Sequence, residues 1–169
     1  IEDRKNLLKS CYKIIFNSNW SKKRFLNGLE NKFVNSDKLV VFFQSAKKNN
    51  SSILKNKKKW ITFVGKLNSA KGYDIFAKSI KKILNNYPEW KAKIIGDEKR
   101  EKIILNHPNA DILGFLNHEH VLKIFKKTSI AVACSRWDEP FGRTSLEASA
   151  NGCAVIITNK GGLPETVTN

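Results

Sequence analysis

Residues 60–85 read WITFVGKLNSAKGYDIFAKSIKKILN, and this stretch decides the fold. Its first five residues, 60–64, are mostly apolar and predict a buried strand. The loop that follows contains two glycines and two lysines, and residues 73–85 predict a helix. A strand, a glycine-containing loop and a helix in this order are typical of a sheet whose strands alternate with helices.

The same alternation continues to the end of the chain. The predicted strands are short apolar runs, as expected where helices cover both faces of a sheet, and right-handed crossovers make such strands parallel. The sequence therefore predicts an α/β fold with a doubly wound, Rossmann-like parallel sheet, in which ligands bind outside the carboxyl ends of the strands. The remaining predicted strands are 92–95, 111–113, 129–133 and 154–158, and the remaining predicted helices are 98–105, 118–126 and 145–150.

The chain before residue 60 is organised differently. Residues 47–59 are polar and rich in lysine, which is the composition of a linker or an exposed crossing loop. We therefore divide the chain into part of a first domain, residues 1–46, a linker, and a second domain, residues 60–169. Within the first part the sequence predicts strands at 12–16 and 39–43 and a helix at 19–29 that a polar cap opens.

Length and composition indicate a folded globular chain. Of the 169 residues, 41% are hydrophobic and 27% are charged, and this length holds one well-buried domain or one domain with a piece of another. The apolar runs are far shorter than the roughly 20 residues that cross a bilayer. The start of the sequence has no pattern of a secretory signal, and because it begins at Ile1 without a methionine we expect a partial chain.

The cysteines indicate a reducing environment. Cys11, Cys134 and Cys153 are widely spaced, and the sequence has no Cys-x-x-Cys pair. This pattern argues against a disulfide framework and against a zinc site. We expect free thiols and a cytoplasmic location.

The chain is strongly basic, with 31 Lys and Arg against 15 Asp and Glu and a formal charge of +16. Such a charge attracts anionic partners, and peripheral contact with the inner face of an anionic membrane is one hypothesis. The lysines are scattered, so a basic surface without a binding role fits equally well. A nucleic-acid-binding module is a distant alternative, because no aromatic-and-glycine RNA signature is present, and we expect no nucleic-acid partner.

Two lysines lie in the loop that follows the first strand of the second domain. Lys66 and Lys71 stand between Gly65 and Gly72, directly before the predicted helix. The N-terminus of a helix presents unpaired N–H groups and a partial positive charge, so lysines there can neutralise a diphosphate. The alternative is a flexible basic turn, because the spacing matches neither a phosphate-loop nor a dinucleotide-binding motif.

Two carboxylates mark the run EPFGRTSLE, residues 139–147, after a later strand. Glu139 and Glu147 can accept hydrogen bonds from sugar hydroxyls, while the glycine and the helix start can receive a phosphate. Two structural alternatives stay open: Thr144 and Glu147 fit a capping box, and the residues before the helix fit a turn. A third loop, 159–165, again joins glycines to an acid. All three loops follow strands and fall at one edge of the predicted sheet.

Together these motifs resemble the C-terminal domain of the retaining glycosyltransferases of family 4, which have the two-domain fold called GT-B. The resemblance covers nearly all of residues 60–169. Residues 1–46 more weakly resemble the end of the preceding, acceptor-side domain. The matching motifs are Val64-Gly65-Lys66 with Lys71-Gly72, Ile94-Ile95-Gly96-Asp97, Leu113-Gly114-Phe115, the pair Glu139 and Glu147, and Gly161-Gly162-Leu163-Pro164-Glu165.

The resemblance implies a role for each matching residue. Lys66 and Lys71 would hold the diphosphate of a nucleotide-sugar donor, with Lys66 offering a single ammonium group where the family usually has a guanidinium. Glu139 would bind the transferred sugar and Glu147 the ribose, and Glu139, Lys66 and Lys71 would be the catalytic residues. The implied donor-binding residues are Gly65, Lys66, Lys71, Gly114, Phe115, Glu139, Phe141, Gly142, Arg143, Thr144, Glu147 and Gly162.

The implied reaction transfers a sugar from a UDP-, GDP- or ADP-linked donor to a hydroxyl of a lipid, lipopolysaccharide or other glycan, and keeps the anomeric configuration. The resemblance implies neither metal nor cofactor, because the lysines and the helix start would stabilise the leaving diphosphate. The alternatives are two other kinds of GT-B enzyme, a nucleotide-sugar epimerase and a glycogen-type synthase or phosphorylase. The body of the acceptor-side domain is missing from the chain, so we expect this part alone to be inactive.

Overall fold

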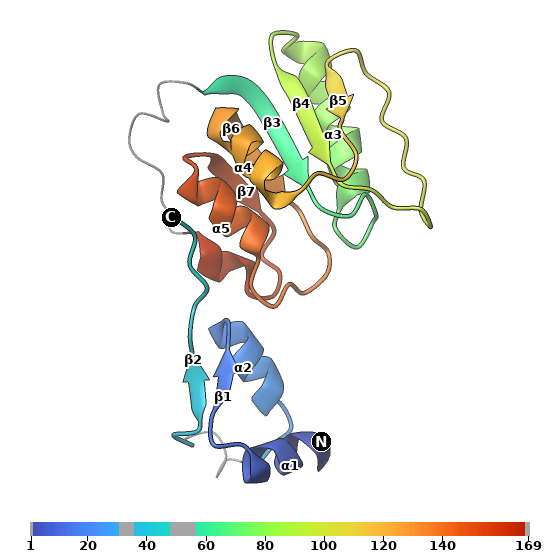
Figure 1. The fold of residues 1–169 in the computed structure, drawn as a ribbon. Coiled ribbons are helices and arrows are strands. Elements are labelled where there is room, and N and C mark those ends of the chain that lie inside the picture. The colour runs from blue at the N-terminus through green and yellow to red at the C-terminus, as the bar shows by residue number, and fades with distance from the viewer. Residues whose placement is uncertain (1, 31–35, 48–56, 168–169) are drawn as a thin grey trace.

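The computed structural model describes residues 2–30, 36–47 and 57–167, which form a small N-terminal unit and a larger unit (Figure 1). The larger unit is built on a sheet whose strands point their carboxyl ends toward the N-terminal unit (Figure 1). The edge of the sheet at which ligands are expected therefore faces the N-terminal unit.

The N-terminal unit alternates helices with two short strands that pair in parallel. Its own small core consists of Leu8, Phe16 and Leu39. The sequence predicts both strands and the second helix with longer bounds, but it does not predict the first helix, which buries only Leu8 and so has no apolar stripe. The elements are α1 (Glu2–Ser10), β1 (Ile14–Phe16), α2 (Asn19–Leu26) and β2 (Leu39–Val41).

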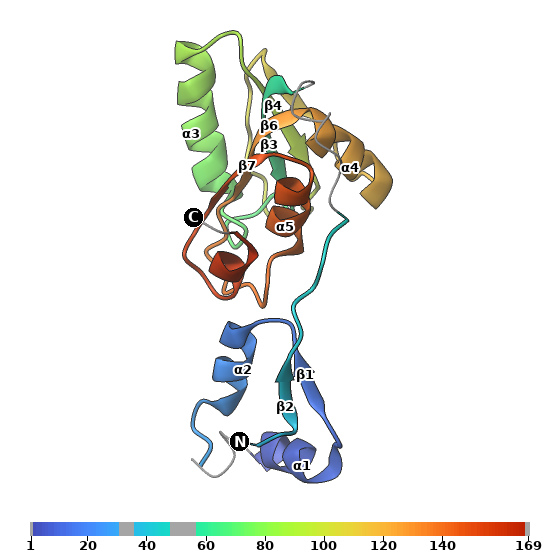
Figure 2. The same ribbon diagram turned by 90° about the vertical axis from the view of Figure 1, so that its left-hand side faces the viewer.

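The larger unit alternates strands and helices as predicted, except between β4 and β5. Its five strands lie in the order β5-β4-β3-β6-β7, and every neighbouring pair is parallel. Figure 2 shows α3 on one face of the sheet and α4 and α5 on the other, which confirms the doubly wound fold. The elements are β3 (Lys58–Val64), α3 (Tyr73–Asn86), β4 (Lys91–Ile95), β5 (Ala110–Ile112), α4 (His118–Lys127), β6 (Thr128–Ala133), α5 (Arg143–Ala150), β7 (Ala154–Ile157) and the 3-10 helix η3 (Leu163–Thr166).

Strand order reverses at the centre of this sheet. The chain adds β4 and β5 on one side of β3 and then returns to add β6 and β7 on the other side. The loops that leave β3 and β6 therefore lead to helices on opposite faces of the sheet (Figure 2), and a crevice lies where the order reverses. In doubly wound sheets this switch point is where ligands bind.

Apolar clusters on both faces hold the sheet between its helices. On the α3 face, Phe76 and Ile80 lie four residues apart on one side of the helix and pack with Phe63 of β3. The ring centroids of Phe63 and Phe76 are 5.2 Å apart. On the other face, Phe125 of α4 and Ala148 of α5 are fully buried in a second cluster. These clusters fix the strands whose ends carry the candidate site.

The predicted helix at 98–105 is wrong, because this segment is irregular. Its acidic side chains bind the β3–α3 loop and therefore do not stabilise the first turn of the predicted helix. The Asn68 side-chain amide donates to Glu98 at 3.0 Å, and the Ser69 backbone N–H and hydroxyl both donate to Glu101. Contacts with a distant loop thus replace local helix formation.

The boundary of the predicted linker also shifts. β3 begins at Lys58, inside the predicted range 47–59, and residues 48–56 lie outside the described residues. Lys57 is partly buried: its ammonium group donates to the carbonyls of Phe125 at 2.9 Å and Asn151 at 2.7 Å. These carbonyls lie near the ends of α4 and α5, so the end of the linker segment ties two helices together.

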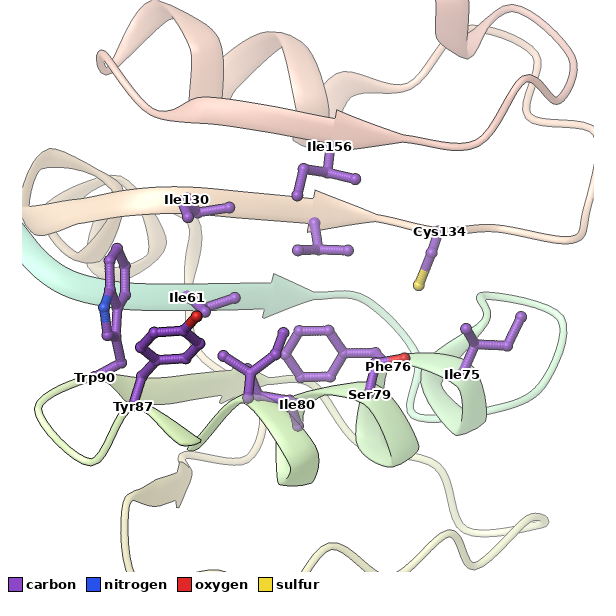
Figure 3. A pocket seen from close by; sticks show the side chains of 12 residues that line it. Ile61, Ile75, Phe76, Ser79, Ile80, Tyr87, Trp90, Ile130, Cys134 and Ile156 are labelled. Carbon is purple, nitrogen blue, oxygen red and sulfur yellow. The ribbon is translucent and has the colours of Figure 1, made fainter. Parts of the chain in front are cut away.

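The α3 face of the sheet is only partly covered. A cavity of about 560 Å³ lies between α3 and the strands, with almost entirely apolar walls (Figure 3). Ile156 of β7 is 56% exposed on this face, because α3 extends over β3 and β4 but not over β7. This cavity lies on the flat of the sheet and offers no cationic side chain for a phosphate.

Candidate functional site

Two loops interlock at the switch point. The β6–α5 loop donates the backbone N–H groups of Arg136 and Trp137 to the carbonyl of Ala70 in the β3–α3 loop, both at 3.0 Å. Gly72 makes this approach possible, because a Cβ atom there would lie 1.9 Å from the Cys134 carbonyl oxygen. The two loops that the sequence predicts to bind the donor are therefore fixed against each other.

Lys71 and Glu139 meet where these loops touch. Their side chains form a salt bridge, and the Glu139 side chain is only 16% exposed. The Ser135 hydroxyl also donates to the Glu139 carboxylate at 2.6 Å. Sequence reasoning did not identify Ser135, although its position four residues before Glu139 in the same loop is a local signal. This cluster places a cation and a carboxylate side by side at the crevice.

The N-terminus of α5 points into the same place. Gly142 caps this helix with a positive φ of 113°, and helical structure begins at Arg143. The first N–H groups of a helix have no partner within it, so they form an anion site. A cavity of about 120 Å³ lies beside the cap. Among its lining residues are six that the sequence predicts: Gly65, Lys71, Glu139, Gly142, Arg143 and Thr144.

Glu147 lies one turn further along α5, and its side chain is 13% exposed. Its Oε1 atom accepts hydrogen bonds from Arg143 and from the His118 ring nitrogen, the latter at 3.0 Å. The capping-box alternative is wrong: the helix is capped by Gly142, without a side-chain hydrogen bond. Glu147 is held by Arg143 and His118 on the side of α5 near the crevice, and His118 is a neighbour that the sequence did not reveal.

The third predicted loop, 159–165, holds the backbone of the second loop in place. The Gly162 N–H donates to the Glu139 carbonyl at 2.6 Å, and a Cβ atom on Gly161 would lie 2.1 Å from that same oxygen. The acid of this loop has a different role from the one its sequence suggests. The Glu165 carboxylate accepts hydrogen bonds from Asn19 and Trp20 at the start of α2, in the N-terminal unit.

Four other predicted residues lie around the crevice but do not line the small cavity. Lys66 is exposed, and within the described ranges its side chain has no hydrogen-bond or ion-pair partner. Gly114 and Phe115 lie in the loop after β5, where the Phe115 ring is exposed. Phe141 is buried, with its ring centroid 6.3 Å from that of Phe43, so its backbone and not its ring can face a ligand.

Two further findings concern the part of the chain that the structure describes. None of its helices is long and apolar enough to cross a membrane. Within the same residues, no group of three or more His, Cys, Asp or Glu side chains is arranged to hold a metal ion.

Known proteins resemble this chain in sequence. Spore coat protein SA of Bacillus subtilis is 28% identical over 123 residues, which cover 65% of this chain and 33% of that protein. The lipopolysaccharide core biosynthesis mannosyltransferase LpsB of Rhizobium meliloti is 31% identical over 121 residues, 66% of this chain and 34% of LpsB. A glycogen synthase of Mycobacterium tuberculosis is 27% identical over 116 residues, 64% of this chain and 28% of the synthase. The chain thus spans about a third of the length of these relatives.

Solved structures and a family model agree with these similarities. Anabaena HepE in complex with UDP-glucose superposes with a TM-score of 0.73 at 19% identity, covering 97% of this chain and 50% of HepE. A glycosyltransferase from Rickettsia africae gives 0.72 at 22% identity, covering 99% and 50%. At these identities the likeness shows the fold, the C-terminal half of a GT-B fold with a remnant of the N-terminal domain. Residues 44–169 match the family model described as glycosyl transferases group 1, and the chain belongs to this family.

Proposed function

We propose that the chain is the donor-binding part of a retaining, family 4 glycosyltransferase, which transfers a sugar from a nucleotide diphosphate to an acceptor hydroxyl. One observation carries the proposal: Lys71, Glu139 and the N-terminus of α5 line one small cavity at the switch point. A cation and a helix start suit a diphosphate, and a carboxylate suits sugar hydroxyls. Membership of the group 1 family and the UDP-glucose complex of HepE support the same class of ligand.

The proposed chemistry needs charge stabilisation on the leaving diphosphate. As the bond between the anomeric carbon and the phosphate oxygen breaks, negative charge grows on that oxygen, and fixed cations and N–H dipoles lower the barrier. Lys71 and the first turn of α5 would meet this charge, and the exposed Lys66 would add a second ammonium group. The acceptor oxygen would bond to the carbon on the face that the phosphate leaves, and its proton would pass to the phosphate. This order of events retains the configuration without a metal.

The nucleoside would lie between α5 and the loop after β5. A carboxylate offers about four acceptor sites, and Glu147 uses its Oε1 atom for the three bonds from Arg143 and His118. It therefore keeps capacity for ribose hydroxyls. Gly114 and Phe115 would border the base, since their loop leaves the neighbouring strand β5.

Calorimetry with UDP, GDP, ADP and the corresponding nucleotide sugars tests the proposal. We expect one base to be preferred, and we expect Glu147→Ala to weaken binding about tenfold, because each charge-assisted bond to a hydroxyl contributes over 1 kcal/mol. Glu119→Ala is the matched control, because Glu119 lies on the exposed surface of α4. EDTA should leave the affinity unchanged. Failure of every nucleotide to bind the folded chain, or an equal loss in the control, would refute the proposal.

We place the proposed acceptor site at the N-terminal unit. A hollow of about 720 Å³ lies between α2 and the β6–α5 loop, and it is lined by Lys22, Lys23 and Arg24 together with Asp138. We propose an anionic glycan or lipid acceptor in the cytoplasm, at the inner face of the membrane, because cations attract anionic headgroups. Co-sedimentation with phosphatidylglycerol vesicles should exceed that with phosphatidylcholine vesicles at low salt. Equal sedimentation with both would remove the membrane from the proposal.

A glycogen-type synthase is the second candidate, and the similarity to the glycogen synthase of Mycobacterium tuberculosis favours it. Such an enzyme would transfer glucose from a nucleotide diphosphate to a glucan. Retention of the chain on a glucan affinity gel, released by soluble glucan, would support this candidate. Binding of lipid vesicles without binding of glucan would favour the first.

A further inference from the structure

The first turn of α2 in the N-terminal unit does not itself supply acceptors for all of its backbone N–H groups. Its first turn contains no acidic residue, although a helix N-terminus favours negative charge and has N–H groups that need acceptors. The Ser18 hydroxyl caps only the N–H of Ser21, at 2.9 Å. The N–H groups of Asn19 and Trp20 need acceptors from elsewhere.

Glu165 supplies them from the other end of the chain. Its Oε2 atom accepts from the Asn19 backbone N–H at 2.7 Å and its Oε1 atom from the Trp20 N–H at 2.8 Å. The Asn19 side-chain amide adds a third bond at 3.1 Å. Glu165 thus provides both the acceptors and the negative charge that the start of α2 lacks, and it fastens α2 to the larger unit.

The start of α2 also holds the loop that carries Glu139. The Ser18 hydroxyl, which is fully buried, donates to the Pro140 carbonyl, and the Ser21 hydroxyl reaches the same oxygen at 3.0 Å. On the opposite side of this loop, the Gly162 N–H donates to the Glu139 carbonyl. Two consecutive carbonyls of the loop are thereby fixed. The donor to Pro140 comes from the N-terminal unit, and the donor to Glu139 comes from the larger unit.

We propose that Glu165 is a positioning residue for Glu139, which acts by clamping α2 onto the β6–α5 loop. Glu165 binds α2, α2 presents Ser18, and Ser18 fixes the carbonyl of Pro140, the residue that follows Glu139. We call this chain of contacts the α2 clamp. The consequence for sugar binding rests on the proposed function, whereas the ordering of the loop does not. Without the clamp the loop loses its anchor in the N-terminal unit, and the backbone that carries Glu139 is held less firmly beside Lys71.

Amide hydrogen exchange tests the clamp without any ligand. Glu165→Gln keeps the size of the side chain but removes its charge and half of its acceptor capacity, and Ser18→Ala removes only the bond to the loop and the cap. We expect both to speed exchange about tenfold at the N–H groups of Arg136, Trp137 and Gly162, whose hydrogen bonds hold this loop, because each lost bond to a partly buried group costs about that factor. Glu89→Gln is the matched control: this exposed acid pairs with Lys59, far from α2.

Calorimetry then tests the positioning of Glu139. Glu165→Gln should lower the ratio of nucleotide-sugar to nucleotide affinity about tenfold, because the sugar depends on Glu139 for an acceptor, and it should not weaken binding of the nucleotide alone. A merely structural role would weaken both ligands equally or lower the unfolding midpoint of the larger unit. If the wild type binds no nucleotide while exchange still rises in Glu165→Gln, the clamp stands and the proposed function fails. Unchanged exchange at Arg136, Trp137 and Gly162 in both variants would overturn the clamp.

Discussion

The Lys71 ammonium group forms a salt bridge with the Glu139 carboxylate, although the two residues are 68 positions apart in the sequence. Both are candidates for donor binding, so the free site is internally neutralised. If the proposed function is correct, a diphosphate would compete with Glu139 for Lys71, and a released carboxylate would be available to the sugar. The pair would then couple recognition of the phosphate to recognition of the sugar.

Glu139→Gln should affect nucleotide and nucleotide-sugar binding in opposite directions. Loss of the carboxylate frees Lys71 and removes a negative charge beside the phosphate site, so the affinity for the nucleotide alone should rise roughly threefold, the value of a partly exposed ion pair. The sugar loses its charged acceptor, so the extra affinity that the sugar contributes should fall. Calorimetric titration of the nucleotide and the nucleotide sugar measures both effects. Weaker binding of both ligands would show that the pair does not compete with the donor.

Gly161→Ala should destabilise the fold more than Gly114→Ala does. The two glycines have similar φ angles, +60° and +66°, so both substitutions incur the same left-handed strain of about 1–2 kcal/mol. Only at Gly161 would the new Cβ atom clash with a backbone atom, the Glu139 carbonyl oxygen, whereas Gly114 has open space. Urea denaturation should therefore show a further loss of about 1–3 kcal/mol for Gly161→Ala. Equal losses of stability in the two variants would mean that the loop moves away from the new Cβ atom without a further loss of free energy.

Lys57→Met should lower the free energy of unfolding by about 2 kcal/mol, because two buried carbonyls lose a charged donor. Lys59→Met is the control, since the Lys59 side chain is mostly exposed and pairs with exposed Glu89. Its effect should stay within about 0.5 kcal/mol. Chemical denaturation of both variants measures the difference, and a Lys57 effect no larger than that of the control would contradict the capping role.

The three thiols should react at different rates. Burial raises the pKa of Cys134 and of Cys153, and because the thiolate is the reactive form, a raised pKa leaves less of it at any pH near 8. Cys11 is partly exposed. Titration of the native protein with a disulfide reagent should modify Cys11 first, and the two buried thiols should gain reactivity only at higher pH or after unfolding. Rapid modification of all three at pH 8 would contradict the burial.

The local sequence pattern was sufficient to predict most strands and helices of the larger unit. The apolar runs of β3, β4 and β6 and the one-sided apolar residues of α3 are visible in the sequence because burial on a regular element leaves a periodic trace. The segment at 98–105 was predicted wrongly for the opposite reason. Its acids bind Asn68 and Ser69 in a distant loop, and no local pattern reports such a partner.

The residues of the candidate site also fall into two groups, those that a sequence motif predicts and those that only the structure reveals. The sequence identified Lys71, Glu139 and Glu147 by their motifs, and the structure brings Lys71 and Glu139 into contact. It did not identify Ser135 or His118, because a single serine or histidine carries no periodic or spacing signal. Each becomes informative only through the carboxylate that it contacts.

By itself, the sequence determined the alternation of strands and helices and the loops that carry charge, since these depend on neighbours within a few residues. Only the tertiary structure decided what those charges contact. Lys71 is paired with Glu139 because the strand order places β3 next to β6. Glu165 caps α2, 145 residues away from Trp20, because the N-terminal unit docks at the carboxyl edge of the sheet. Strand order and docking follow from the packing of whole elements, and periodicity along the chain does not encode them.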